Sequence, residues 1–436
     1  MKRIYRGLIL FLVVIIPFAL VSCKSSSAET DSDTAPGDIE TADTAAAKGD
    51  EIEIVLSTAS QDLFGGWVVH ALITNNADYT VGNAELEFIA HGGDGSAVFN
   101  ETIYTLPYGL SPGEEQPFSI RLPLSITAID DFEFNILNLY LMERNTVQLD
   151  QGVFRMVSAE NGVVTLLGEI SNNAGLPAVI RSARAVLFST DGEIINSAAC
   201  DVCARYLSTG KSSPMSFSFY GHQTAAEIDH YEIYLSTETA DSIGMVDVEF
   251  LEPVHAYVDD AGTFHLLGDL KNTGEEILDL SLLGTFYNAA GELVGVSSTN
   301  LPVSSLLPGE SSPYEMIIFA PLDLVADWSL QVDLSRSRKV DTPSLELNAQ
   351  EVLVTPEEYK WVISGDAVND SDQDLTMVLI VAGLRDTSTG ELIGLSYTLE
   401  AGEFPIGSLI SYNLIISPNT ALDPATLNSF VIVKGR

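Results

Sequence analysis

Residues 306–314, LLPGESSPY, are the clearest sign of the fold, because the chain repeats them. Close copies stand upstream, as LSPGEEQPF at residues 110–118 and LSTGKSSPM at residues 207–215, and an altered copy lies downstream at residues 404–412. The glycines of the four copies follow one another after 97, 99 and 98 residues: Gly113, Gly210, Gly309 and Gly407. Repetition at a nearly fixed step indicates four copies of one structural unit.

Other residues repeat in step with this phrase. Turn glycines recur after 97, 99 and 99 residues: Gly95, Gly192, Gly291 and Gly390. In the first copy, apolar residues stand at every second position from Trp67 to Ile73, and the other copies show the same alternation. This is the period of a half-buried strand. An asparagine ends the strand in every copy, and we expect it to close a turn, with a ligand role as the alternative: Asn75, Asn172, Asn272 and Asn369.

The phrase itself has the composition of a connection between two strands. Proline fixes φ and glycine accepts a positive φ, so the pair favours a turn. We expect the first leucine and the last aromatic residue to be buried, and the second proline to begin the next strand. We expect the glutamate and the polar residues after it to face water.

Each unit contains six or seven short strand patterns, separated by turn residues, and shows no sustained helical period. Such spacing predicts an all-β fold of four tandem immunoglobulin-like antiparallel β-sandwich domains, with a barrel as the alternative. The predicted domains are repeats one to four, at residues 50–146, 147–243, 244–341 and 342–436.

The chain is strongly acidic, with 61 Asp and Glu against 20 Lys and Arg and a net charge of −41. This charge argues against nucleic-acid binding, which needs a basic face, and against electrostatic docking on anionic lipid. We interpret the acidity as solubility of an exported protein, and cation binding is the alternative.

The N-terminus predicts export and lipid attachment. Residues 1–22 contain a basic start, MKRIYR, and a 14-residue apolar run that is short for a membrane span and typical of a secretory signal peptide. The run ends in Leu20-Val21-Ser22-Cys23, which resembles the lipobox of bacterial lipoproteins. That resemblance implies that Cys23 becomes the lipid-modified mature N-terminus; a simple signal anchor is the alternative. Residues 23–49 are rich in Ser, Thr, Ala, Asp and Glu and predict a disordered tether.

The repeated motifs G-x-[VIL]-x-N, aromatic-x-x-x-G and L-x-P-G-E-x-x-P-[FY] resemble FxLYD-type immunoglobulin-like repeats of bacterial envelope proteins. The resemblance covers residues 50–436, although the pentapeptide that names the family is altered to AVLFS at residues 185–189 and GTFYN at residues 284–288. It implies an extracytoplasmic interaction or spacer module without known catalytic residues. It supplies no functional residue that can be transferred to this chain.

One repeat alone carries a CxxC pair, Cys200 and Cys203. An exported compartment favours a disulfide between them. Zinc would need two further ligands, and a thiol-redox centre would need a helix N-terminus in a chain that is rich in strand patterns. Free thiols remain a fourth possibility.

An acidic segment, NDSDQDL, is the weak candidate for a metal site. Asp370, Asp372 and Asp374 have the alternation that can ligate Ca²⁺, but an EF-hand loop requires glycine and an acid where Leu375 and Val381 stand. We therefore predict a solvated turn there, and no cofactor. The six histidines are scattered and no catalytic motif is present, so we predict that the protein is not an enzyme.

Together these patterns predict a lipid-anchored, extracytoplasmic protein of the cell envelope that acts as a non-catalytic interaction or spacer module. Its partners would be the membrane, through Cys23, and a protein or glycan that the sequence does not identify. The alternative is a glycan- or solute-binding lipoprotein, for which Tyr79, Tyr108 and Tyr359 are candidate exposed aromatics. A redox helper based on Cys200 and Cys203 is a third possibility.

Overall fold

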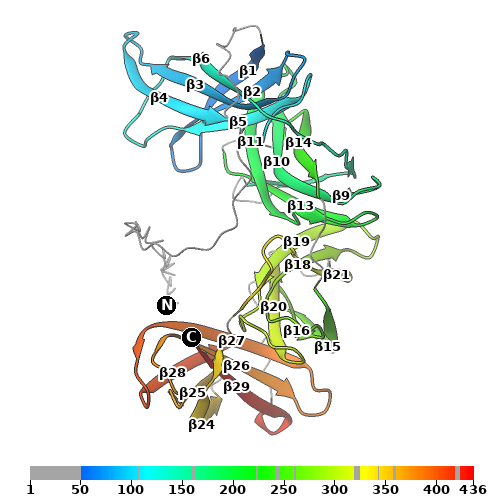
Figure 1. Cartoon of the computed structure of the whole chain (residues 1–436), viewed down its shortest axis with the longest axis vertical. Helices are drawn as coiled ribbons and strands as arrows, with labels where there is room; N and C mark the ends of the chain where they lie inside the picture. Colours follow the sequence, from blue (N-terminus) through cyan, green and yellow to red (C-terminus); the bar gives the residue numbers. More distant parts are fainter. Residues whose placement is uncertain are drawn as a thin grey trace, which may run out of the picture. The chain divides into compact units, whose positions relative to one another are not determined.

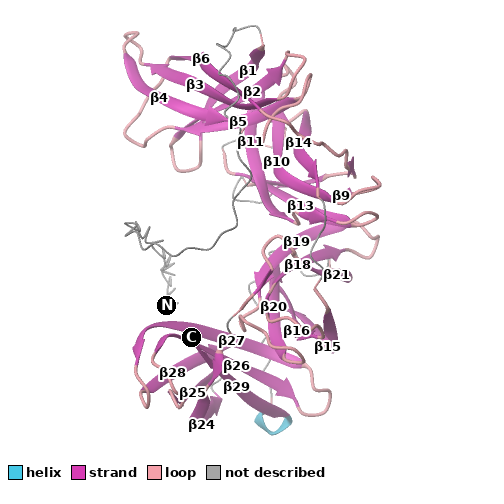
Figure 2. Cartoon of the chain, viewed as in Figure 1, coloured by secondary structure: helices cyan, strands magenta, loops and turns pink. Residues whose placement is uncertain are grey.

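The computed structural model describes residues 51–106, 108–158, 163–221, 224, 226–240, 246–259, 262–318, 325–341, 343–356, 360–417 and 423–436. The predicted signal peptide, Cys23 and the predicted tether lie outside these residues, as does Tyr359. The described chain consists of antiparallel strands and a single short 3-10 helix, Pro424–Thr426 (Figure 2). The predicted all-β, immunoglobulin-like sandwich fold is confirmed. No helix in the described part of the chain has the length and apolarity needed to cross a membrane.

Repeat one contains two three-stranded sheets (Figure 1). The first has the order β1-β2-β5, with bounds Ile52–Gln61, Trp67–Asn75 and Glu115–Arg121. The second has the order β4-β3-β6, with bounds Ala97–Thr105, Val81–His91 and Asp131–Leu141. Side chains from both sheets share the core, for example Ile73 with Leu86 and Val69 with Phe88. Two sheets packed through alternating side chains make a β-sandwich.

Repeats three and four follow the same plan. In repeat three, β15-β16-β20 faces β19-β18-β21, with a short β17-β22 pair; the bounds are Val248–Val258, Phe264–Asn272, Ser311–Ile318, Leu293–Asn300, Ser281–Tyr287, Asp327–Val332, Leu278–Asp279 and Arg338–Lys339. In repeat four, β24-β25-β28 faces β23-β29-β26-β27, with bounds Asn348–Pro356, Trp361–Val368, Leu409–Ile416, Leu345–Glu346, Leu427–Gly435, Leu375–Asp386 and Leu392–Phe404.

Repeat two joins its two sheets through β11. The continuous order is β12-β10-β11-β13-β9-β7, with β14 on β10 and β8 on β9. The bounds of β7 to β14 are Asp150–Gln151, Arg155–Ser158, Val164–Ser171, Ala178–Phe188, Ile194–Cys203, Tyr206–Leu207, Ser212–Phe219 and His230–Thr239. The part of β11 up to Ala199 pairs with β10, and the part from Cys200 pairs with β13, with a register shift between Cys200 and Val202. A bulge of this kind bends a strand and lets it serve both sheets.

The last residue of the quoted phrase lies opposite a small residue in every repeat. The cross-strand pairs are Ala71 with Phe118, Gly168 with Met215, Gly268 with Tyr314 and Gly365 with Tyr412. In repeats three and four a Cβ on the glycine would lie 2.5 or 2.6 Å from the tyrosine hydroxyl oxygen. The small residue at this position therefore leaves room for the large side chain on the opposite strand.

The four strand-ending asparagines make one set of hydrogen bonds. Each side-chain amide is buried and donates to two carbonyls, one four residues later and one on the first residue of the phrase. Each side-chain oxygen accepts from the backbone N–H two residues later. The backbone carbonyl of the asparagine accepts from the phrase glycine, which has φ between 73° and 80°. The asparagine thus ties the end of one strand to the turn that precedes another.

We expect Asn272→Ala to destabilise repeat three by about 2–3 kcal/mol, because it removes the three hydrogen bonds of a buried side chain: two to the carbonyls of Glu276 and Leu306, and one from the Gly274 N–H. Denaturant unfolding of the full chain, followed by the fluorescence of Trp328 in the same repeat, measures this loss. Asn300→Ala is the matched control, since Asn300 is exposed, and we expect a change within about 0.5 kcal/mol. Equal losses in the two variants would contradict the structural role of Asn272.

Candidate functional site

The junctions between neighbouring repeats use the same position on successive domains. All described residues belong to one compact unit, Asp43–Arg436. Strands β2, β9 and β16 occupy the same place in repeats one to three. On each of them one residue points away from its own core and contacts the next repeat: Leu72, Glu169 and Asp269. The partner comes just before the turn between two strands of that next repeat: Phe188, Tyr287 and Arg385.

Three different interactions occupy this shared position. Leu72 belongs to one apolar cluster with Phe188. The Tyr287 hydroxyl donates to the Glu169 carboxylate at 2.9 Å, and burial, followed by this bond, raises the pKa of Tyr287 to about 12. Arg385 donates to Asp269 at 2.7 Å. The geometry of the junction is therefore repeated while its chemistry changes.

The glutamates of the quoted phrase also take part in the junctions, so the prediction that they face water is wrong for two repeats. Glu114 accepts from Arg144 at 3.1 Å, and the fully buried Arg144 side chain also donates to the Thr237 carbonyl of repeat two. Glu310 pairs with Lys434 of repeat four at 2.5 Å. Neighbouring domains bury these charges together, which strengthens the pairing.

The junction of repeats one and two holds a buried histidine. His70 on β2 is 3% exposed, and its Nδ1 lies 3.2 Å from the Ser119 hydroxyl of β5 and 3.0 Å from the Ser197 hydroxyl of repeat two. Burial lowers the pKa of His70 to about 4, and the charges of Arg184 and Arg121 act in the same direction. The imidazole is therefore neutral near pH 7 and joins the two repeats by hydrogen bonds.

A cleft of about 730 Å³ lies beside this histidine, between the same two repeats. Repeat one contributes Tyr104 and Tyr108, at and after the end of β4, and hydroxyl-bearing residues of β4 and β5. Repeat two contributes residues of β10 and β11. Four arginines line the cleft, namely Arg121, Arg181, Arg184 and Arg205. The volume is in the range of small-molecule binding sites.

The arginines of the cleft differ in their partners. Arg121 pairs with the buried carboxylate of Asp62, and Arg181 pairs with Glu238 at 2.8 Å. Neither Arg184 nor Arg205 has an acidic partner among the described residues. Burial lowers the pKa of Arg184, because it disfavours the charged guanidinium.

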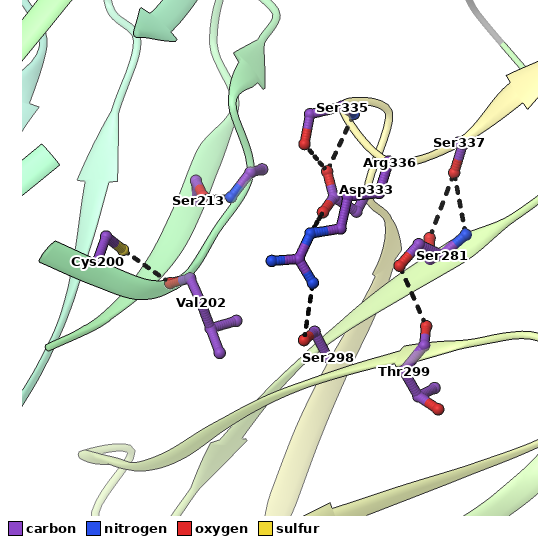
Figure 3. Close-up of polar contacts among 11 residues, drawn as sticks. Cys200, Val202, Ser213, Ser281, Ser298, Thr299, Asp333, Ser335, Arg336 and Ser337 are labelled. Carbon is purple, nitrogen blue, oxygen red and sulfur yellow. Dashed lines mark hydrogen bonds and ion pairs between the residues drawn. The ribbon is translucent and has the colours of Figure 1, made fainter. Parts of the chain in front are cut away.

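The cysteine pair lines the same cleft. The register shift after Cys200 replaces ordinary alternation, so that Cys200 and Cys203 both pack against the core of repeat two. Both cysteines are free, and no disulfide joins them in this structure. The Cys200 thiol donates to the Val202 carbonyl at 3.1 Å (Figure 3). A hydrogen bond from Cys200 lowers the pKa of Cys203, and Arg205 and Arg336 act with it against burial. The predicted disulfide and the redox role both stay predictions.

An ion pair of repeat three, Asp333 with Arg336, lies beside the strand that carries the cysteine pair (Figure 3). Asp333 is fully buried and accepts from the backbone N–H and the hydroxyl of Ser335 at 3.0 and 2.5 Å. Figure 3 shows Arg336 between Asp333 and Ser298, with its guanidinium directed toward the ribbon that carries Cys200 and Val202. The Arg336 charge influences Cys203, which places this ion pair close to the thiols.

The weak Ca²⁺ candidate of the sequence, Asp370, Asp372 and Asp374, does not form a cluster in the structure. Asp370 accepts from Asn348, and Asp374 accepts from the backbone N–H of Ile406 at 3.0 Å. No group of three or more His, Cys, Asp or Glu residues that could hold a metal ion occurs in the described part of the chain. The side chains of the four strand-ending asparagines bond to the backbone and do not point into a ligand site.

Sequence reasoning missed the arginines of the cleft. They come from the end of β5, from two positions on β10 and from the link between β11 and β12, and these segments meet only when repeats one and two dock. The one available signal was the scarcity of basic residues, since four of the 20 in the chain line a single cleft.

No family model matches the chain, and no curated protein matches it. Among solved structures, the chain is similar to the native conformation of Escherichia coli alpha-2-macroglobulin, with 9% identity and a TM-score of 0.12. The alignment covers 86% of this chain and 26% of that one, so this chain spans about a quarter of its length. A likeness at this score says nothing about activity or partners.

We expect acid to weaken the protein through His70. Its pKa is about 4 in the folded chain and 6.5 in the unfolded chain, so the unfolded state binds the proton first. Stability therefore falls as the pH drops from about 6.5 toward 4, by about 3 kcal/mol from this residue. Unfolding free energies measured across that range should show a smaller drop in His70→Gln, whereas His91→Gln, at the surface of the same repeat, should retain the full drop. Equal slopes in native protein and His70→Gln would refute the assignment.

Proposed function

We propose that the chain is a lipid-anchored, extracytoplasmic protein of the bacterial cell envelope, and that its four repeats form a non-catalytic interaction and spacer module of the FxLYD-type class. The lipobox-like sequence at Cys23 and the acidic segment after it support an anchor followed by a tether. The folded repeats would then be held away from the membrane surface.

The repeated junction is the observation that carries the spacer role. The same position of one domain meets the same position of the next at all three junctions, through Leu72, Glu169 and Asp269. In repeat four the equivalent residue, Asp366, instead accepts from the Ser411 hydroxyl of its own repeat at 2.6 Å. Domains joined by defined contacts hold a fixed spacing, whereas domains on free linkers do not.

A second function, binding of a glycan or solute, is favoured by one specific observation. The cleft between repeats one and two combines two tyrosines, several hydroxyls and four arginines in a volume of about 730 Å³. The other two junctions include the Tyr287–Glu169 hydrogen bond and the Arg385–Asp269 ion pair, and no such cleft with four arginines is found among their described residues. A ligand site of this kind is compatible with the spacer role, because it uses one junction only.

We expect Cys23→Ser to abolish lipid attachment, because the thiol is the attachment point in the lipobox-like sequence. In a bacterial host, native protein should incorporate a labelled fatty acid and sediment with membranes, and the variant should do neither. Cys200→Ser is the matched control and should behave as native protein. Fatty-acid incorporation into Cys23→Ser would overturn the anchor.

We expect Asp269→Asn to loosen the junction of repeats three and four, because it removes the partner of Arg385. The pair is partly exposed, so the loss is about 1 kcal/mol, and limited proteolysis of the full chain within residues 340–347 should accelerate about fivefold. Asp366→Asn changes the same position in the last repeat and should leave the cleavage rate unchanged. Rapid cleavage of the native chain at this segment would contradict a spacer with defined junctions.

A further inference from the structure

The cleft between repeats one and two reverses the charge balance of the protein. Acidic residues outnumber basic residues 61 to 20 in the whole chain. In the lining of the cleft four arginines stand against a single acid, Glu101. After the pairs of Arg121 with Asp62 and Arg181 with Glu238 are counted, Arg184 and Arg205 remain as positive charges without acidic partners among the described residues.

We propose that this cleft binds a ligand that carries two or more carboxylate groups, and that an acidic oligosaccharide of two or three sugar units is the form that fits it. Arg184 and Arg205 would each receive a carboxylate, and Tyr104 and Tyr108 would contact the rings. The proposal rests on the second proposed function, binding of a glycan or solute in this cleft, and is independent of the spacer role and of the lipid anchor.

Arg184 is the strongest argument for an anionic ligand. It lies in the middle of β10 and lines both the large cleft and a second hollow of about 370 Å³ next to His70. A half-buried guanidinium without a partner is unfavourable, and its lowered pKa reflects that burial. A carboxylate from a ligand would complete a charge-assisted and often bidentate pair, which is the geometry that arginine favours.

Arg205 supplies the second positive charge. It follows β11, where the Ile180 backbone N–H donates to its carbonyl and so fixes the segment beside β10. Its charge acts on Cys203, another residue of the lining, which places the guanidinium near the wall of the cleft rather than away from it. Two separate cationic groups favour a ligand with more than one carboxylate over a ligand with one.

The remaining lining favours a ring-bearing ligand with hydroxyl groups. Tyr104 is 61% exposed although it is a large aromatic residue, and its hydroxyl donates to Glu85 at 3.1 Å, which holds the side chain in place. Tyr108 lies at the same wall, and Thr102, Ser119 and Ser182 add hydroxyls. Aromatic rings together with hydrogen-bonding groups in a cleft of this volume are typical of ligand sites that orient a polar, partly apolar molecule.

Calorimetric titration of the full, reduced chain with trigalacturonate at low salt tests the proposal. We expect saturable binding that weakens with added salt. Arg184→Gln and Arg205→Gln should each weaken it about tenfold or more, because each loses a hydrogen-bonded charge pair. Arg338→Gln is the matched control, since Arg338 is an exposed arginine of repeat three, and it should bind as native protein. Thermal unfolding of each variant checks that it is folded.

The choice of probes separates the possible ligands. Maltotriose has the size of trigalacturonate without its charge and should not bind, while bound trigalacturonate should slow alkylation of Cys200 and Cys203, which share the cleft. Binding of citrate with the same sensitivity to Arg184→Gln would support the paired-carboxylate chemistry with a smaller ligand. Three results would overturn the proposal: no binding of either acid, equal weakening by Arg338→Gln, or binding of sulfate as tight as that of both acids.

Discussion

The fold depends on the side-chain amide of one asparagine in each repeat. This amide is buried at the point where a strand ends and the backbone would otherwise leave polar groups without partners. In repeat three, Asn272 bonds Glu276, Leu306 and Gly274, and its backbone carbonyl accepts from Gly309. The bonds join segments separated by more than 30 residues, so they set the position of the phrase relative to the strand. The strand that follows the phrase then pairs in the register that places its aromatic residue over the small residue opposite.

The outer faces of these sandwiches form the contacts between neighbouring domains. The outward residues of β2, β9 and β16 meet the next domain, and Leu379 and Val381 of repeat four extend the apolar cluster of repeat three. Apolar contact, a hydrogen bond and an ion pair serve the same position, because a junction of fixed geometry tolerates any pair of complementary groups. The first junction is apolar at this position and buries the neutral His70, and the adjoining cleft gathers positive charge that an otherwise acidic protein lacks.

Some of these features could be predicted from the sequence because their chemistry is local. Strand alternation, the asparagine that ends a strand and the Pro-Gly turn each depend on neighbours within a few residues. The junction position could not be predicted, since it holds an apolar residue in repeat one and an acid in the other three, and the acid of repeat four, Asp366, bonds within its own repeat. The prediction that Glu114 and Glu310 face water was wrong for a related reason. Their partners, Arg144 and Lys434, are distant in the sequence, and the docking of the next domain buries Arg144 and brings Lys434 to Glu310.

The sequence by itself determined the all-β fold, the step of the repeats and the turn between their strands, because side-chain period and turn propensity act over short distances along the chain. Only the tertiary structure decided which outward residues contact the next repeat, that Cys200 and Cys203 lie on one side of a bulged strand, and that arginines from three segments line one cleft. These arrangements follow from the docking of domains, and docking brings together residues whose separation in sequence carries no periodic signal.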